Sequence, residues 1–161
     1  MTVRLPSFFA VGIIALGLAA IGVWIPAAHA ADPGIKQVVS ANDVNTTADK
    51  LESILKSKGI TVFARVDHAA GAKKVGKTLR PTVLLVFGNP NLGTPLMQQK
   101  QLIGLDLPLK ALIYEAENGK TYISYNDPAY LSKRHGIAKP EKVFSKMSGA
   151  LKNFTAAAAK K

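Results

Sequence analysis

Alternating and helically spaced apolar positions follow one another along the chain, and each stretch predicts a secondary-structure element. Two-residue alternation and short apolar runs between turn residues predict strands at 35–39, 60–68, 81–87, 109–117 and 120–126. Apolar spacings of three and four predict helices at 46–58 and 140–155. Cap and proline residues predict helices at 96–103 and 127–136, and a short, glycine-interrupted helix is expected at 69–79. The resulting order, β-α-β-α-β-α-β-β-α-α, predicts one α+β domain. We expect an antiparallel or mixed sheet with helices packed mainly on one face.

Turn and cap residues set the expected ends of these elements. Thr46, with Asp49 three residues later, approximates a capping box for the first long helix. The tetrad 88–91 is typical of a turn. Asn118-Gly119 predicts a type I′ hairpin, because both residue types accept a positive φ. We expect the last residues, 156–161, to fray.

The first thirty residues have the features of an export leader. Arg4 is their only charge, positions 5–25 are almost wholly apolar, and Pro26 then breaks the run. Ala28-His29-Ala30 has the small-x-small pattern that signal peptidase cleaves, so we expect cleavage before Ala31 and a periplasmic or secreted domain. Retention as a membrane anchor stays open, since about 20 apolar residues can span a bilayer.

The chain is therefore expected to have four parts. These are a signal peptide at 1–30, a linker at 31–34, one domain at 35–138, and a basic C-terminal helix and tail at 139–161. The terminal helix carries one apolar stripe, formed by Val143, Met147, Leu151 and Phe154.

Composition then limits the class of protein. Hydrophobic residues make up 48% of the 161 residues, which is too much for a wholly disordered chain. Because there is no cysteine, a disulfide framework, a zinc–thiolate site and a thiol nucleophile are excluded. Lys and Arg number 21 against 10 acidic residues, a net charge of +11 that falls to +10 when Arg4 leaves with the leader.

An exported domain with this charge meets lipid headgroups, envelope polymers and small anions. Its lysines are spread over 36–161, and no stretch combines basic and aromatic residues in the way that single-stranded nucleic acid requires. Nucleic acid is therefore not expected as a partner. An anionic membrane surface and a homodimer stay open.

Five short motifs stand at the expected element ends: Asp67-His68-Ala69-Ala70-Gly71, Phe87-Gly88-Asn89-Pro90, Gly93-Thr94-Pro95-Leu96-Met97, Asp106-Leu107-Pro108-Leu109 and Arg134-His135-Gly136. In this order they resemble the domain of unknown function 302 family, over about 35–137. The resemblance implies a compact α+β domain of the TATA-box-binding-protein-like class, with a β-α-β(several)-α layout. It implies no activity, and a fold shared with a DNA-binding protein does not transfer DNA binding.

The polar side chains of these motifs are the candidate ligand-binding residues: His68, Asn89, Thr94, Asp106 and His135. They lie at expected strand ends and turns, and we expect them to edge one pocket. Thr94 is also expected to cap a helix whose first turn holds Pro95, where backbone N–H groups suit an anion. The alternative stays open that each histidine braces a loop or a helix end, and that Asp106 braces a turn.

No cofactor and no metal are expected. Without cysteine, a metal would depend on His68, His135 and nearby carboxylates, and the sequence has neither an HExxH motif nor a clustered histidine pair. The sequence also lacks a Walker loop, a GxSxG motif and a dinucleotide fingerprint.

These features favour a non-catalytic exported domain that binds a small anionic ligand attracted by the positive charge. A first alternative is a module that contacts an envelope protein or a membrane surface through an edge strand and the basic helix at 139–161. A second is a small hydrolase-like or acid–base enzyme using His68 or His135, with Asp106 or Asp127 assisting.

Overall fold

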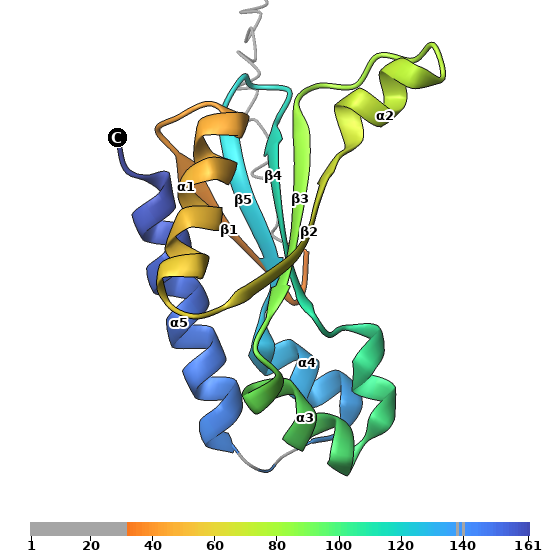
Figure 1. The fold of residues 1–161 in the computed structure, drawn as a ribbon, viewed down its shortest axis with the longest axis vertical. Coiled ribbons are helices and arrows are strands. Elements are labelled where there is room, and N and C mark those ends of the chain that lie inside the picture. Colours follow the sequence, from red (N-terminus) through yellow and green to blue (C-terminus); the bar gives the residue numbers. More distant parts are fainter. Residues whose placement is uncertain (1–31, 138, 140) are drawn as a thin grey trace, which may run out of the picture.

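The described residues form a five-stranded antiparallel sheet with the strand order β1-β5-β4-β3-β2 (Figure 1). The strands are β1 (Ile35–Ser40), β2 (Thr61–Asp67), β3 (Thr82–Gly88), β4 (Leu109–Glu115) and β5 (Thr121–Asn126). The coordinates are those of a computed structural model, which describes residues 32–137, 139 and 141–161. The expected leader and its cleavage before Ala31 lie outside the described residues.

The helices occupy three places around the sheet (Figure 1). They are α1 (Val44–Ser57), α2 (His68–Lys74), α3 (Pro90–Gln99), the 3₁₀ helix η1 (Gln101–Leu105), α4 (Pro128–His135) and α5 (Glu141–Ala159). Helices α1 and α5 lie against one face of the sheet, α3 and α4 lie beyond one of its ends, and α2 projects from the other end. The predicted element order and the α+β class are confirmed, and the sheet is antiparallel.

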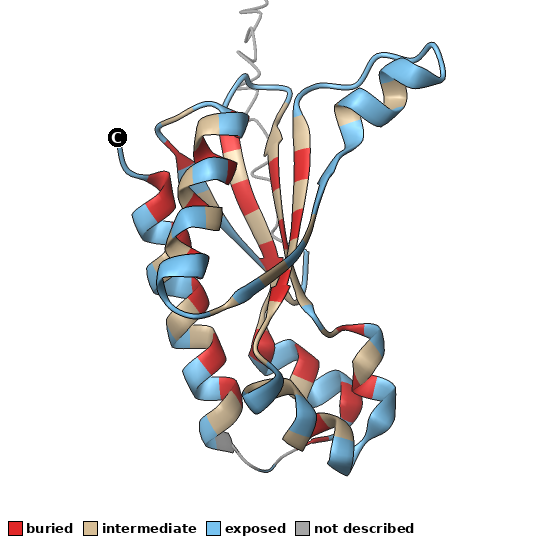
Figure 2. Cartoon of the chain, in the orientation of Figure 1, coloured by how far each residue is buried: buried red, intermediate tan, exposed pale blue. Residues whose placement is uncertain are grey.

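Alternation along β3 builds the main core. Val83, Leu85 and Phe87 face the helix-covered side, each at most 2% exposed, with half-buried residues between them (Figure 2). They pack with Leu51 and Leu55, which the helical repeat of α1 places one turn apart on the same side. Burying each such side chain is worth about 1.5–3 kcal/mol.

Helix α5 contributes to two clusters of buried side chains. Its C-terminal half adds Leu151 and Ala158 to the sheet core. Its N-terminal half adds Phe144 and Met147 to a second cluster, which is formed with α3, η1 and α4. The spacing of these residues keeps them on one stripe of the helix. Helix α5 therefore connects the sheet to the helices beyond its end.

The predicted fraying of residues 156–161 is wrong for most of that stretch. Helix α5 continues to Ala159, and Ala158 is fully buried. The Ala41 backbone N–H donates to the Ala159 carbonyl at 2.9 Å, and the Asn42 side-chain amide donates to the Lys160 carbonyl at 2.7 Å. Because alanine side chains are small, the end of the helix can approach the chain between β1 and α1 closely.

The predicted capping box at Thr46 is also wrong. Helix α1 begins at Val44, because the Asp43 carboxylate caps it by accepting hydrogen bonds from the Thr46 backbone N–H at 2.8 Å and from the Thr46 hydroxyl at 2.7 Å. These hydrogen bonds lower the pKa of Asp43, since they stabilise the ionised form. Asp49 instead forms an ion pair with Arg65 of β2.

The residues predicted to form a turn at 88–91 form a helix start. Asn89 caps α3 and accepts a hydrogen bond from the Asn91 backbone N–H at 2.9 Å, and Pro90 occupies the first helical position. Thr94 and Pro95 therefore lie inside α3, and the expected anion site at a Thr94 helix start is wrong. Both Asn89-Pro90 and Thr94-Pro95 have the cap-and-proline pattern, and the earlier one begins the helix.

The hairpin between β4 and β5 is confirmed, with a different turn. The Gly119 backbone N–H donates to the Ala116 carbonyl, and the Ala116 N–H donates to the Lys120 carbonyl. Gly119 has a φ of +71°, whereas no described residue other than glycine has a positive φ. This pattern is a three-residue loop that ends in a left-handed glycine, because Asn118 does not adopt the conformation a type I′ turn needs.

Helix α5 is expected to be required for folding. Leu151→Ala is expected to lower the free energy of unfolding by about 2–4 kcal/mol, since it opens a cavity between α5 and the sheet. The neighbouring Lys152→Ala, at an exposed position of the same helix, is the matched control and should change it by less than about 0.5 kcal/mol. Urea unfolding followed by circular dichroism measures both, and equal small effects would show that α5 is not part of the core.

Candidate functional site

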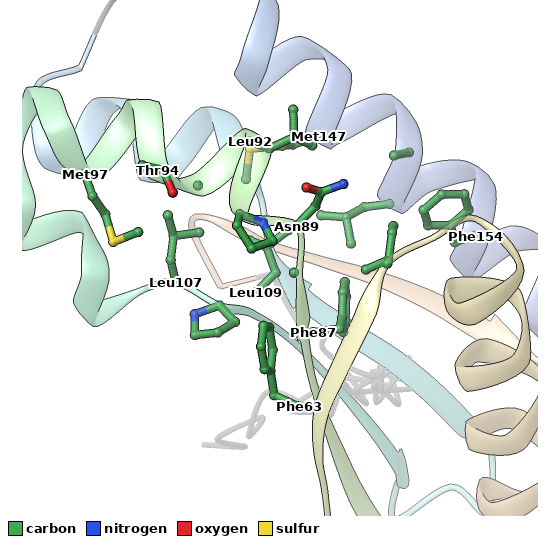
Figure 3. A pocket seen from close by; sticks show the side chains of 17 residues that line it. Phe63, Phe87, Asn89, Leu92, Thr94, Met97, Leu107, Leu109, Met147 and Phe154 are labelled. Atoms are coloured by element: carbon green, nitrogen blue, oxygen red, sulfur yellow. The ribbon is translucent and has the colours of Figure 1, made fainter.

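A cavity of about 260 Å³ lies where the end of β3, the helix α3, the segment entering β4 and the middle of α5 meet (Figure 3). It is lined by Ile60, Phe63, Phe87, Gly88, Asn89, Pro90, Leu92, Gly93, Thr94, Met97, Leu107, Pro108, Leu109, Met147, Ala150, Leu151 and Phe154. Asn89 and Thr94 carry the polar side chains of this lining; Asn89 is the N-cap of α3, and Thr94 lies inside that helix. None of the lining residues is ionisable.

Phe63 reaches the cavity because β2 is irregular at that point. The register of β2 against β3 shifts between Val62 and Ala64, which takes Phe63 out of the regular ladder. Its ring lies beside Gly88, where an added Cβ would be 3.6 Å from the ring. Phe63 remains 54% exposed, so the cavity is open to solvent on this side.

Two methionines stand on different walls of the cavity, Met97 on α3 and Met147 on α5 (Figure 3). A thioether side chain is unbranched and polarisable, so it adapts to ligands of different shape at low cost. Phe154 and Leu107 complete the apolar surround in Figure 3. This arrangement can hold an apolar group and hydrogen-bond one polar atom near Asn89 or Thr94.

Asp106 and His135 form a buried pair beside the cavity. The His135 Nε2 atom lies 2.6 Å from Asp106 Oδ2, and the two side chains are 4% and 10% exposed respectively. Arg134 Nη1 lies 3.5 Å from the other carboxylate oxygen. The pair ties the end of η1 to the end of α4, and Leu107, the next residue after Asp106, lines the cavity. Asp106 and His135 therefore position a wall of the cavity without facing into it.

His68 lies at the opposite end of the sheet from the other candidate residues. In the β2–β3 pair, Asp67 is opposite Val83 and Thr61 is opposite Gly88. His68 follows Asp67, whereas Asn89 follows Gly88, so the full length of β3, roughly 20 Å, separates them. The expectation that His68 edges the same pocket as the other four is therefore wrong, because antiparallel pairing places these two loops at different ends.

Asp127, expected as an assisting carboxylate in the acid–base alternative, does not line the cavity either. Asp127 caps α4 by accepting from the Ala129 backbone N–H at 3.0 Å, and it lies 3.3 Å from Lys36 Nζ. Tyr114 and Tyr122 stack on each other, with ring centres 5.8 Å apart. Within residues 32–161, apart from the undescribed positions, no group of three or more carboxylates and histidines is placed to hold a metal ion.

Sequence reasoning missed the apolar side chains that define the cavity. The sequence places Met147 and Phe154 on the apolar stripe of a terminal helix, and that stripe does pack inward. Both side chains also line the cavity, which the stripe alone does not predict. The position of the Phe63 side chain depends on the register shift in β2, which the alternating pattern of the sequence does not reveal. Of the predicted site residues, Asn89 and Thr94 line the cavity, Asp106 and His135 support its wall, and His68 is remote.

The Asp106–His135 pair is expected to hold the cavity wall in place. Asp106→Ala should lower the free energy of unfolding by about 3 kcal/mol, because it leaves His135 buried without its partner. Glu117→Ala is the control, since Glu117 pairs with Arg80 at an 89%-exposed side chain and should contribute less than about 1 kcal/mol. Denaturant unfolding of the two variants, and of a double-mutant cycle that combines Asp106→Ala with His135→Ala, measures the interaction energy between Asp106 and His135. An interaction energy of zero would show that the pair does not hold the cavity wall.

Comparison with known proteins gives three kinds of match. The family model described as "Domain of unknown function DUF302" matches residues 36–154, which extends beyond position 137 into α5. Three curated relatives are each 48% identical over 112 residues: "Fluoride-specific ion channel FluC 1" of Brucella suis biovar 1, a protein of the same name in Brucella abortus biovar 1, and "Fluoride-specific ion channel FluC 2" of Brucella melitensis biotype 1.

The curated relatives are longer than the matched region. It covers 70% of this chain but 44% of the first relative and 42% of the other two, so the chain spans less than half of their length. In the part of this chain that the structure describes, no helix is both long and apolar enough to cross a membrane.

A solved structure shares the fold. The crystal structure of an uncharacterized conserved DUF302 protein from Bacillus stearothermophilus superposes with a TM-score of 0.66 at 23% identity, covering 79% of this chain and 96% of that one. With the family model matching residues 36–154, this chain belongs to the domain of unknown function 302 family.

Proposed function

We propose that the domain binds a small, largely apolar molecule in the cavity between β3, α3 and α5. The observation that carries this proposal is the lining itself: apolar side chains from several elements surround a hollow, and two polar side chains, Asn89 at the N-cap of α3 and Thr94 inside that helix, lie among them. Small-molecule sites in proteins commonly combine an apolar surround with a few polar groups that orient the ligand.

The size of the cavity limits the ligand. Its volume of about 260 Å³ lies between an engineered cavity of about 150 Å³ that binds benzene and the range of about 300–1,000 Å³ common for drug-sized ligands. A molecule with one or two rings, or a short branched chain, fits this volume. One hydroxyl or carbonyl group on it would meet Asn89 or Thr94.

The lining does not favour the anionic ligand that the net charge suggested. No Lys, Arg or His lines the cavity, and an anion transferred from water to an apolar surround without a cation is strongly disfavoured. The acid–base enzyme alternative also gains no support here, because the buried Asp106–His135 pair lies outside the lining. We therefore propose a neutral ligand and binding without catalysis.

A neutral aromatic probe is expected to stabilise the chain and a charged probe of similar size is not. Toluene at ten times its Kd should add about 1.4 kcal/mol of stability, because it binds the folded state only. In a domain of this size that raises Tm by about 5 °C. Benzoate should leave Tm unchanged. Differential scanning calorimetry measures both.

Two phenylalanine variants of α5 make this test specific to the cavity. Ala150→Phe places a ring in the cavity and should abolish the toluene effect. Ser145→Phe adds the same ring at an exposed position of the same helix and should leave the effect intact. An equal response to benzoate, or a toluene response that survives in Ala150→Phe, would contradict the proposal.

We propose in addition that the domain acts beside a membrane transport protein. The supporting observation is that three curated relatives named as fluoride-specific ion channels contain a region 48% identical to this chain, which makes up 42–44% of their length. A channel needs membrane-spanning segments, so in those proteins we assign the channel to the part that this chain does not match. A region joined to a channel is held beside it at high effective concentration.

Loss of this chain is expected to change how cells handle fluoride. Cells lacking its gene should retain more fluoride after exposure to sodium fluoride than cells that carry the gene, and a plasmid copy should reverse the difference. A fluoride-selective electrode measures the retained ion, and exposure to sodium chloride is the control. Equal retention with and without the chain would reject this second proposal.

A further inference from the structure

Residues 68–81, which we call the basic arm, connect β2 to β3 and extend beyond the end of the sheet (Figure 1). The arm consists of α2 and the segment that returns to β3. None of the residues of α2 is buried, and the arm is almost wholly exposed in Figure 2. Such a projecting segment adds little to the core, so its side chains are free to serve a contact with another surface.

Hydrogen bonds close both ends of α2, although the helix is exposed. The Asp67 carboxylate caps its start by accepting from the Ala70 backbone N–H at 2.8 Å. At its end the Gly76 N–H donates to the Lys73 carbonyl and the Lys77 N–H donates to the Ala72 carbonyl. Gly76 has a φ of +71°, as this type of helix end requires. The backbone of α2 is therefore capped at both ends within the arm.

Aliphatic side chains are exposed on the arm. Val75 is 70% exposed and Leu79 is 47% exposed, while Val66, at the adjoining end of β2, is 39% exposed. A single exposed aliphatic residue is ordinary on a protein surface. Two of them on one projection, with a third at its base, give apolar surface that a partner or a membrane would cover.

Positive charge surrounds these aliphatic side chains. Lys73, Lys74 and Lys77 lie within five positions, and residues 68–81 contain no acidic residue. None of these lysines forms an ion pair with a carboxylate of the described residues. Arg80 at the base of the arm donates to the Glu115 carbonyl and lies 3.6 Å from Glu117. The tip is therefore cationic and apolar at once.

We propose that the basic arm docks on an anionic lipid bilayer. Its aliphatic side chains enter the boundary between headgroups and acyl chains, and the lysines remain at the level of the headgroups. Each lysine near an anionic leaflet strengthens binding, and long basic side chains suit this depth. This surface differs from the basic helix at 139–161 that the sequence suggested for membrane contact.

Docking through the arm would leave the cavity accessible. The arm joins β3 at Thr82, whereas the cavity lies at the other end of the strand, beyond Gly88. A seven-residue antiparallel strand is roughly 20 Å long, so the membrane contact and the cavity do not compete for surface. The membrane contact therefore stands independently of ligand binding.

A fluorophore at the tip of the arm tests the proposal in the full chain. The chain has no cysteine, so Val75→Cys can be labelled with nitrobenzoxadiazole at one position. Its emission should shift to the blue and strengthen with vesicles of phosphatidylcholine mixed with phosphatidylglycerol, and not with phosphatidylcholine alone. The same label on Ser145→Cys, an exposed position of α5, should not respond. Because the label reports one position, lipid binding by the apolar leader does not imitate the signal.

Charge variants of the labelled chain separate the arm from the rest of the basic surface. Replacing Lys73, Lys74 and Lys77 with Gln should weaken the response at position 75 by roughly tenfold or more in lipid concentration. Replacing Lys142, Lys146 and Lys152, which are exposed on α5, removes the same charge elsewhere and should change it less than about twofold. A label at position 75 that stays in water with anionic vesicles would overturn the proposal and leave an acidic protein as the partner to test. An equal response with neutral vesicles would also overturn it.

Discussion

The burial of one stripe of α5 is the interaction on which the rest of the structure depends. Leu151 and Ala158 close the core between the sheet and α1, while Phe144 and Met147 close the second cluster with α3, η1 and α4. Both clusters share this helix, so it fixes the position of the end helices relative to the sheet. It also forms one wall of the cavity, through Met147, Ala150, Leu151 and Phe154. Stability and the candidate site therefore rest on the same packing.

The cavity follows from how these two packing units meet. Side chains of β3 fill the space under α1 and α5, and side chains of α4 and η1 fill the space beneath α3, but the junction between the two remains open. The Asn89 cap fixes where α3 begins, and the Asp106–His135 pair fixes the segment that enters β4. These two contacts position the walls of the cavity, and the thioethers of Met97 and Met147 give those walls adaptable surfaces. A preformed hollow with adaptable walls suits binding better than acid–base chemistry.

The sequence predicts the order of elements well because periodicity and caps agree there. Helix α4 begins after Asp127 and ends at Gly136 with a φ of +63°, both as predicted. The start of α3 was predicted wrongly because Asn89-Pro90 and Thr94-Pro95 both have the pattern of a helix cap, and tertiary packing selects between them. Prediction also failed for His68, since the end of the sheet that a loop occupies depends on strand pairing. The cavity itself was not predictable, because a space that no side chain fills is a property of three-dimensional packing.

Binding of a neutral apolar molecule in the cavity beside α5 can be followed at the methionines that line it. The chain contains three methionines, Met1, Met97 and Met147, and the latter two line the cavity. Carbon-13 labelling of the methionine methyl groups allows Met97 and Met147 to be followed by NMR during a titration with toluene. We expect both signals to move and to saturate at the same toluene concentration. Unchanged signals from Met97 and Met147, or a drift of both that does not saturate, would contradict binding in the cavity.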